Sequence, residues 1–159
     1  MTWFDWGHAD HDLLAFASRI IHFHHQHPVF QRRRWFVGRA LRGADVTDIA
    51  WFKPDGEPMT DQDWQNGFAR TLGVFLNGKA IPTPDAHGDP IVDDSFYILF
   101  NAHWEPLPFT LPTCGWGDRW VKAIDTNKPI PDLREQHQHR AGEVLEIEAH
   151  SMMVLRRVD

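Results

Sequence analysis

After Gly43 the chain consists of short apolar runs separated by turn signals, and this pattern constrains the fold more than any other feature. The runs are Ile49 to Phe52, Thr71 to Leu76, Phe96 to Phe100, Trp120 to Ile124, Val144 to Ile147 and Met152 to Leu155. The turn signals between them are Pro54-Asp55-Gly56, Asn77-Gly78, Glu105-Pro106, Gly115 to Gly117, and Gly142. Short strands at such spacing, without intervening helices, are typical of an antiparallel β-sandwich. We therefore expect a mainly β domain over residues 44–159.

Two of these runs indicate how their strands are covered. Around Val144 to Ile147, apolar residues alternate with Glu146 and Glu148, which is the pattern of a strand with one buried face. The run from Phe96 to Phe100 is apolar throughout, as expected for a central strand that is covered on both faces. We therefore expect Phe100 and Leu76 to be fully buried.

Two segments between the runs lack strand character. Residues Thr60 to Trp64 (Thr-Asp-Gln-Asp-Trp) predict a capped helical turn, because Thr60 and Asp63 have the spacing of a capping box. Residues 82–94 are rich in Pro, Asp and Gly and predict a loop.

Residues 13–27 carry the clearest helical signal. Apolar residues recur there at helical spacing and form one stripe, made of Leu13, Leu14, Phe16, Ala17, Ile20, Ile21 and His24. Asp10 or Asp12 is placed to cap the start, since a carboxylate there accepts hydrogen bonds from unpaired backbone N–H groups. Pro28 ends the helix because it disfavours the helical conformation at His27.

The apolar stripe has few partners in its own neighbourhood. In front of it, Trp3, Phe4 and Trp6 surround Asp5 and form an aromatic cluster that also needs a packing partner. Large apolar patches rarely remain free on soluble monomers. We therefore expect the chain either to form a two-fold homodimer through this region or to fold the helix back onto the sandwich.

The aromatic content is high, with eight Trp and eleven Phe. Exposed Trp rings can stack on sugars, but core and interface packing is the commoner use. The candidates for either use lie in loops or at strand edges: Trp51, Trp64, Trp104 and Trp116. Coplanar exposed rings in a groove would indicate a carbohydrate-binding module, which is the alternative function.

Net charge limits the classes of partner that the chain can bind, and cysteine content indicates its cellular compartment. The formal net charge of −6 gives no electrostatic basis for binding nucleic acid or an anionic membrane. The basic run Arg32-Arg33-Arg34 is short and predicts a solvated or ion-paired face. Cys114 has no second cysteine to pair with, and no apolar stretch approaches the length of a membrane span. With no signal-peptide pattern at the amino terminus, the sequence favours a cytoplasmic protein.

No complete catalytic or metal site emerges from the residues. Glycoside hydrolysis needs two carboxyl groups facing each other across the bond. Asp93 and Asp94 are adjacent, so they would point apart on a strand, and turn hydrogen bonds explain them better. Four histidines lie close together in the helical segment: His22, His24, His25 and His27. Two of them three positions apart share a helix face and could bind a metal ion, but the sequence identifies no third ligand and no second shell. We therefore predict no catalytic residue, no metal and no cofactor.

Several segments in order resemble the bacterial glycogen-debranching enzymes, which are isoamylase-type members of the α-amylase superfamily of glycoside hydrolases. The segments are Trp3 to Trp6, Asp12 to Phe16, His27 to Arg33, Asp48 to Gly56, Met59 to Trp64, Leu72 to Gly78, Asp93 to Phe96, and Leu99 to His103. Each is modest alone, but the ordered set covers essentially the whole chain.

The resemblance implies a parent enzyme with an amino-terminal β domain, a catalytic (β/α)₈ barrel and a carboxy-terminal β-sandwich. Residues 1–43 would then supply the final helical segment of the barrel, and residues 44–159 the sandwich. The family hydrolyses α-1,6 branch linkages of glycogen or limit dextrin with retention of configuration. Its catalytic carboxylates lie on earlier barrel strands that have no counterpart here. Trp3, Asp5 and Trp6, at the barrel end, are the candidate substrate-binding residues.

Three hypotheses about function therefore compete. The leading one is a non-catalytic domain that packs on the barrel and stabilises it, reaching α-glucan only through the parent. The second is the carbohydrate-binding module. The third, an independent hydrolase, requires a pocket with two facing carboxylates.

Overall fold

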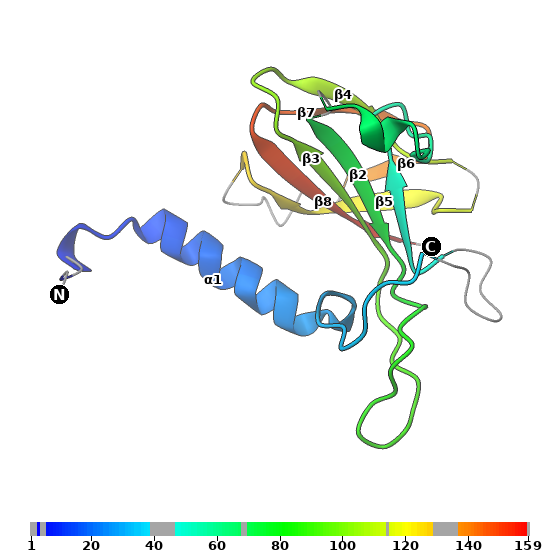
Figure 1. Cartoon of the computed structure of the whole chain (residues 1–159). Coiled ribbons are helices and arrows are strands. Elements are labelled where there is room, and N and C mark those ends of the chain that lie inside the picture. Colours follow the sequence, from blue (N-terminus) through cyan, green and yellow to red (C-terminus); the bar gives the residue numbers. More distant parts are fainter. Residues whose placement is uncertain are drawn as a thin grey trace.

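The computed structural model describes residues 3, 6–38, 47–67, 70–113, 115–128 and 137–158 (Figure 1). Its helical elements are η1 (Trp6–His8), α1 (His11–Gln26), η2 (Pro28–Phe30) and η3 (Asp63–Gln65). Its strands are β1 (Ile49–Phe52), β2 (Thr71–Leu76), β3 (Phe96–Asn101), β4 (Leu107–Thr110), β5 (Arg119–Asp125), β6 (Gln138–Arg140), β7 (Val144–Ile147) and β8 (Ser151–Arg157).

The strands form two antiparallel sheets, so the predicted mainly β, sandwich-like architecture is confirmed. The larger sheet has the order β1-β2-β3-β8-β5-β6, and β4 and β7 form a second, two-stranded sheet. All six predicted runs are strands. Two further strands were not predicted from the sequence: β4, which contains Pro108, and β6, whose residues Gln138 to Arg140 are all polar.

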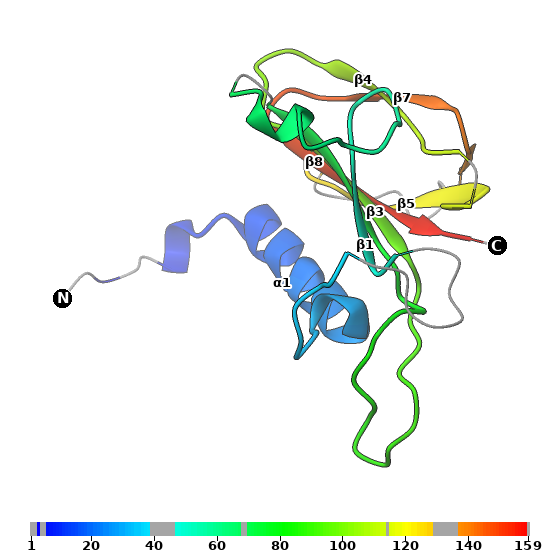
Figure 2. The same cartoon turned by 45° about the vertical axis from the view of Figure 1, so that its right-hand side comes forward.

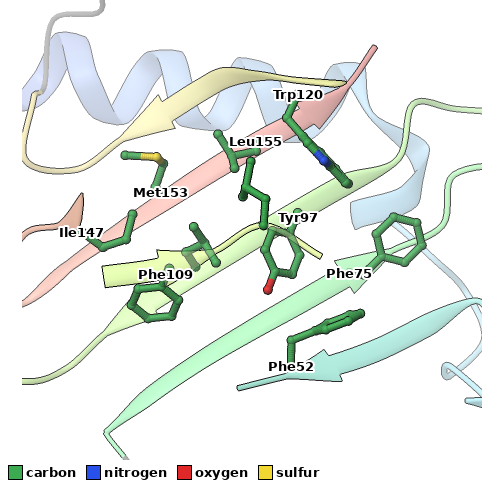
Figure 3. Close-up of a cluster of buried hydrophobic side chains, with 10 residues drawn as sticks. Phe52, Phe75, Tyr97, Phe109, Trp120, Ile147, Met153 and Leu155 are labelled. Atoms are coloured by element: carbon green, nitrogen blue, oxygen red, sulfur yellow. The ribbon is translucent and has the colours of Figure 1, made fainter. Parts of the chain in front are cut away.

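The main core lies between the two sheets, on what we call the inner face of the six-stranded sheet (Figure 3). Its buried members are Phe52, Phe75, Tyr97, Leu99, Phe109, Leu111, Trp120, Ile147, Met153 and Leu155. Close packing in this core requires glycine at position 73, because a Cβ at Gly73 would collide with the Tyr97 hydroxyl. Burial also raises the pKa of Tyr97 because it disfavours the phenolate.

Helix α1 has the boundaries that its capping residues predict. The Asp10 Oδ1 atom accepts a hydrogen bond from the Leu13 N–H at 2.9 Å. His27 is extended, with φ −116° and ψ 100°, and Pro28 begins η2. Figure 2 shows α1 on the side of the six-stranded sheet opposite β4 and β7. None of the helices among the described residues is long and apolar enough to cross a membrane.

The two predicted non-strand segments also appear. The Asp63 carboxylate accepts hydrogen bonds from the Thr60 N–H and hydroxyl, and a 3₁₀ turn, η3, follows. Residues 82–94 belong to a loop without strands that extends beyond the sheet between β2 and β3 (Figure 1). The predicted boundary between residues 43 and 44 lies outside the described residues, so it stays a prediction.

The expected full burial of Phe100 is wrong, whereas that of Leu76 is confirmed. Leu76 is 6% exposed, but Phe100 is 38% exposed. Phe100 lies on the face of the six-stranded sheet opposite the main core, which we call the outer face. The sandwich covers only the inner face, so an apolar strand does not imply cover on both sides.

Candidate functional site: the outer face

The outer face of the six-stranded sheet is apolar, and its cover decreases along the strands. Strand register aligns its residues in rows across β2, β3 and β8: Leu76, Phe96 and Arg156; then Val74, Ile98 and Val154; then Leu72, Phe100 and Met152. Phe96 is fully buried, Ile98 is partly buried and Phe100 is exposed. One end of the outer face is therefore open.

Helix α1 covers the other end with only part of its apolar surface. Phe16, Ile20 and Phe23 lie on one side of the helix and pack against the outer-face cluster. The Phe23 and Phe96 rings meet edge to face, with centroids 5.5 Å apart. On a neighbouring side, Leu14 and Ile21 are 54% and 59% exposed. The predicted stripe thus divides into a covered row and an exposed row.

A buried carboxylate fixes the exit of α1 to the sheet. Asp93 accepts hydrogen bonds from the Val29 N–H at 2.9 Å and pairs with His27 Nδ1 at 2.8 Å. Asp93 also accepts a local hydrogen bond from the Asp94 N–H, so the predicted turn bond exists. The long-range bonds were not visible in the sequence. They link segments more than 60 positions apart and orient α1 on the outer face.

The basic run also contributes to this attachment. Arg32 is ion-paired with the buried Asp48 at 3.0 Å and lies over the Phe36 ring. The second Asp48 oxygen accepts the Gly38 N–H at 2.9 Å. The ion-paired interpretation is therefore confirmed for Arg32, whereas Arg33 and Arg34 are exposed.

The four candidate Trp side chains separate into two groups. Trp116 packs in the main core against Phe52, with ring planes at 90°. Trp51 and Trp64 are exposed near the open end of the outer face, with ring planes 81° apart. Trp104 is exposed and carries the Arg70 guanidinium 4.3 Å from its centroid. The Trp51–Trp64 pair therefore lacks the coplanar arrangement expected of a sugar platform.

The structure describes the predicted substrate-binding residues only in part. Trp3 is 92% exposed, and Trp6 begins the short helix η1. Asp5 and Phe4 lie outside the described residues, as does Cys114. Trp3 lines none of the three cavities described below. These assignments remain predictions.

Carboxylates in the described cavities do not face one another in pairs. A cavity of about 420 Å³ beside η2 contains Asp85, and one of about 340 Å³ at the open end contains Asp63. A third, of about 480 Å³, contains Arg33 and Trp35 but no carboxylate. A glycosidase acid needs a raised pKa. Hydrogen bonds instead lower the pKa values of Asp55, Asp63 and Glu143. The largest cause is the hydrogen bond with Lys53 for Asp55, with Thr60 for Asp63 and with His139 for Glu143.

Comparison with known proteins gives this arrangement a family. The model of the family described as "Isoamylase, C-terminal" matches residues 48–157. The chain is 43% identical over 160 residues to the "Glycogen operon protein GlgX homolog" of Mycobacterium tuberculosis, covering 99% of this chain and 22% of the relative. It is 36% identical over 116 residues to the glycogen debranching enzyme of Dickeya chrysanthemi, covering 73% of this chain and 14% of that protein.

A more distant similarity connects the chain with an isoamylase. It is 24% identical over 123 residues to that of Pseudomonas amyloderamosa, covering 77% of this chain and 14% of the relative. The chain thus spans about a fifth or less of the length of each of these three relatives. The resemblance seen in the sequence is confirmed, and the chain belongs to the isoamylase carboxy-terminal domain family.

Proposed function

We propose that the chain is the carboxy-terminal part of a glycogen-debranching α-1,6-glucosidase, that it packs on the catalytic (β/α)₈ barrel and that it stabilises this barrel. Residues 1–43 supply the final helical segment of the barrel, and residues 44–159 form the sandwich. The parent enzyme acts on glycogen or limit dextrin in the cytoplasm. The chain itself carries no catalytic residue.

The division of α1 into two apolar rows is the observation that carries this proposal. Phe16, Ile20 and Phe23 pack on the sandwich, whereas Leu14 and Ile21 are exposed on the adjacent side. A helix with one covered and one exposed apolar row has the surface expected of an element between two bodies. The closing helix of a barrel that also contacts the following domain would need both rows.

The open end of the outer face supports the same partner. Phe100, Trp51 and Trp64 are exposed there. Strand register places Phe100 and Trp51 on the face of the sheet against which α1 packs. Obligate interfaces are rich in apolar and aromatic side chains. We infer that the barrel covers the exposed row of α1 and part of this open end together.

Co-expression with a barrel tests the proposal. The partner is the part of the Mycobacterium tuberculosis relative that this chain does not match. We expect the two pieces to co-purify, and the melting temperature of the partner to rise. The double variant Leu14→Asp/Ile21→Asp should weaken co-purification strongly, because it places two charges in the exposed row. Val92→Asp, on the exposed β2–β3 loop, is the matched control.

Two outcomes would contradict the proposal. One is equal co-purification of the double variant and the Val92→Asp control. The other is release of reducing ends from glycogen, pullulan or limit dextrin by the purified chain alone, abolished by a single carboxylate substitution within it. The second result would establish an independent hydrolase.

A further inference from the structure

Three potential metal ligands meet at the β6 edge of the six-stranded sheet, away from α1. His137 directly precedes β6, His139 lies within it, and Glu143 follows the turn that leads into β7. One ligand atom from each residue lies within 4.8 Å of the others. This cluster uses none of the residues that carry the proposed function.

The local backbone explains why these side chains converge. Positions two apart on an extended strand point to the same side, which brings the His137 and His139 rings to a centroid distance of 4.7 Å. Gly142 turns the chain with φ +77°, a conformation that favours glycine. The turn returns Glu143 to the strand, where one carboxylate oxygen lies 2.7 Å from His139 Nδ1 and the other accepts the Arg140 N–H at 2.8 Å.

The donor set suits a borderline transition metal. Two imidazole nitrogens and one carboxylate oxygen favour Zn²⁺, Co²⁺, Ni²⁺ or Cu²⁺ over Mg²⁺ and Ca²⁺, which prefer oxygen ligands. Bonds to zinc are about 2.0–2.2 Å long, so modest side-chain rotations would bring all three donors onto one ion. His137 is exposed, which leaves a path for the ion to enter.

A second cluster of His27, Asp93 and Asp94 is less suited to a cation. There, Asp93 already receives the Val29 N–H and pairs with His27, and Asp94 pairs with the Arg156 guanidinium at 3.2 Å. The arginine occupies the position of a competing cation. Among the described residues, Glu143 has no such Lys or Arg partner.

We propose that His137, His139 and Glu143 form a binding site for a divalent transition-metal ion. The ion would connect β6, in the six-stranded sheet, with the start of β7, in the two-stranded sheet. It would therefore join the two layers of the sandwich at one edge. The site was not predicted from the sequence because β6 was not recognised as a strand, although the sequence contains His-x-His followed four residues later by Glu.

Titration of the untagged, metal-free full chain with Zn²⁺ tests the site. We expect one Zn²⁺ per chain by calorimetry and a rise in melting temperature on adding Zn²⁺, but not on adding Mg²⁺. His137→Ala and Glu143→Gln should each weaken Zn²⁺ binding at least about ten-fold. His137→Ala is the decisive variant because the residue is exposed, whereas His139 lies opposite the buried Trp120.

The α1 histidines provide a matched control. His22→Ala/His25→Ala removes two imidazoles from an exposed helical face and should leave Zn²⁺ affinity unchanged. Absence of Zn²⁺ binding by the wild type would overturn the assignment. Unchanged affinity in His137→Ala, or loss of binding only in the helix variant, would do so as well.

Discussion

The two faces of the six-stranded sheet differ in which parts of the chain bury their side chains. On β3, Tyr97 and Leu99 point to the inner face and are fully buried beneath the β4–β7 sheet. Phe96, Ile98 and Phe100 point to the outer face, where burial decreases from Phe96 to Phe100. The domain completes its inner core from its own residues. Among the described residues, the cover of its outer face comes from α1, η2 and nearby loop side chains such as Phe36 and Ile81, and it leaves Phe100 exposed. We expect a partner outside the sandwich to cover the rest.

The largest expected effect is the difference in stability loss between a buried phenylalanine of the inner face and an exposed one of the outer face. Phe75→Ala should cost about 3–5 kcal/mol of unfolding free energy, because Phe75 is fully buried on the inner face. Phe100→Ala should cost only about 1 kcal/mol, since solvent already reaches that side chain. Urea unfolding of both variants measures the difference. Equal losses would show that the outer face is as well packed as the inner one.

A pair of adjacent carboxylates tests how α1 is held on the outer face. Asp93→Ala should cost about 2 kcal/mol, because it leaves the Val29 N–H and His27 without their buried acceptor. Asp94→Ala should cost at most about 1 kcal/mol, since its pair with Arg156 is exposed. Thermal unfolding and proteolysis near residue 27 compare the two. Loss of α1 protection in the Asp94 variant instead would reverse our assignment of the anchor.

Most of the described strands and the ends of α1 could be predicted from the sequence, whereas the cover of the outer face could not. Apolar runs bounded by turn residues located six strands, and Asp10 and Pro28 located the ends of α1. The polar strand Gln138 to Arg140 was missed because only its pairing with β5 defines it. The exposure of Phe100 was missed because an apolar side chain does not reveal which layer, or which other protein domain, covers it.

The site was less predictable than the fold. Asp93 reaches His27 and Val29 across more than 60 positions, and no local pattern signals such a bond. Sequence also could not distinguish the core residue Trp116 from the exposed Trp64, since both lie between the predicted strands and both are candidates for stacking.

Substitutions in the exposed row of α1 should weaken self-association of the chain and leave its unfolding free energy nearly unchanged. If the isolated chain forms a two-fold homodimer, Leu14→Asp/Ile21→Asp should shift it toward monomer in sedimentation velocity. Its unfolding free energy should change by about 0.5 kcal/mol or less per site, because both residues are exposed.

Deleting residues 1–27 should also leave a folded, more monomeric sandwich, because the main core contains none of them. The deletion, however, removes Phe23 from Phe96, so the point variants are the cleaner test. An unchanged dimer in the double variant would place the contact elsewhere.

The smallest expected effect concerns the turn at the open end of the outer face, next to Trp64. The hydrogen bond from the Thr60 N–H, and then that from the Thr60 hydroxyl, lower the pKa of Asp63 from its usual 3.8. A carboxyl group whose pKa is lowered by folding stabilises the folded state above its unfolded pKa, and this contribution is lost as pH falls through the folded pKa. Asp63→Asn should therefore be slightly less stable than the wild type at neutral pH, and the difference should disappear as the pH falls below the lowered pKa of Asp63. Asp61→Asn, which removes the same charge from an exposed neighbour, is the control. Thermal melts of the three proteins between neutral and acid pH provide the measurement, and a difference that grows on acidification would refute the assigned turn.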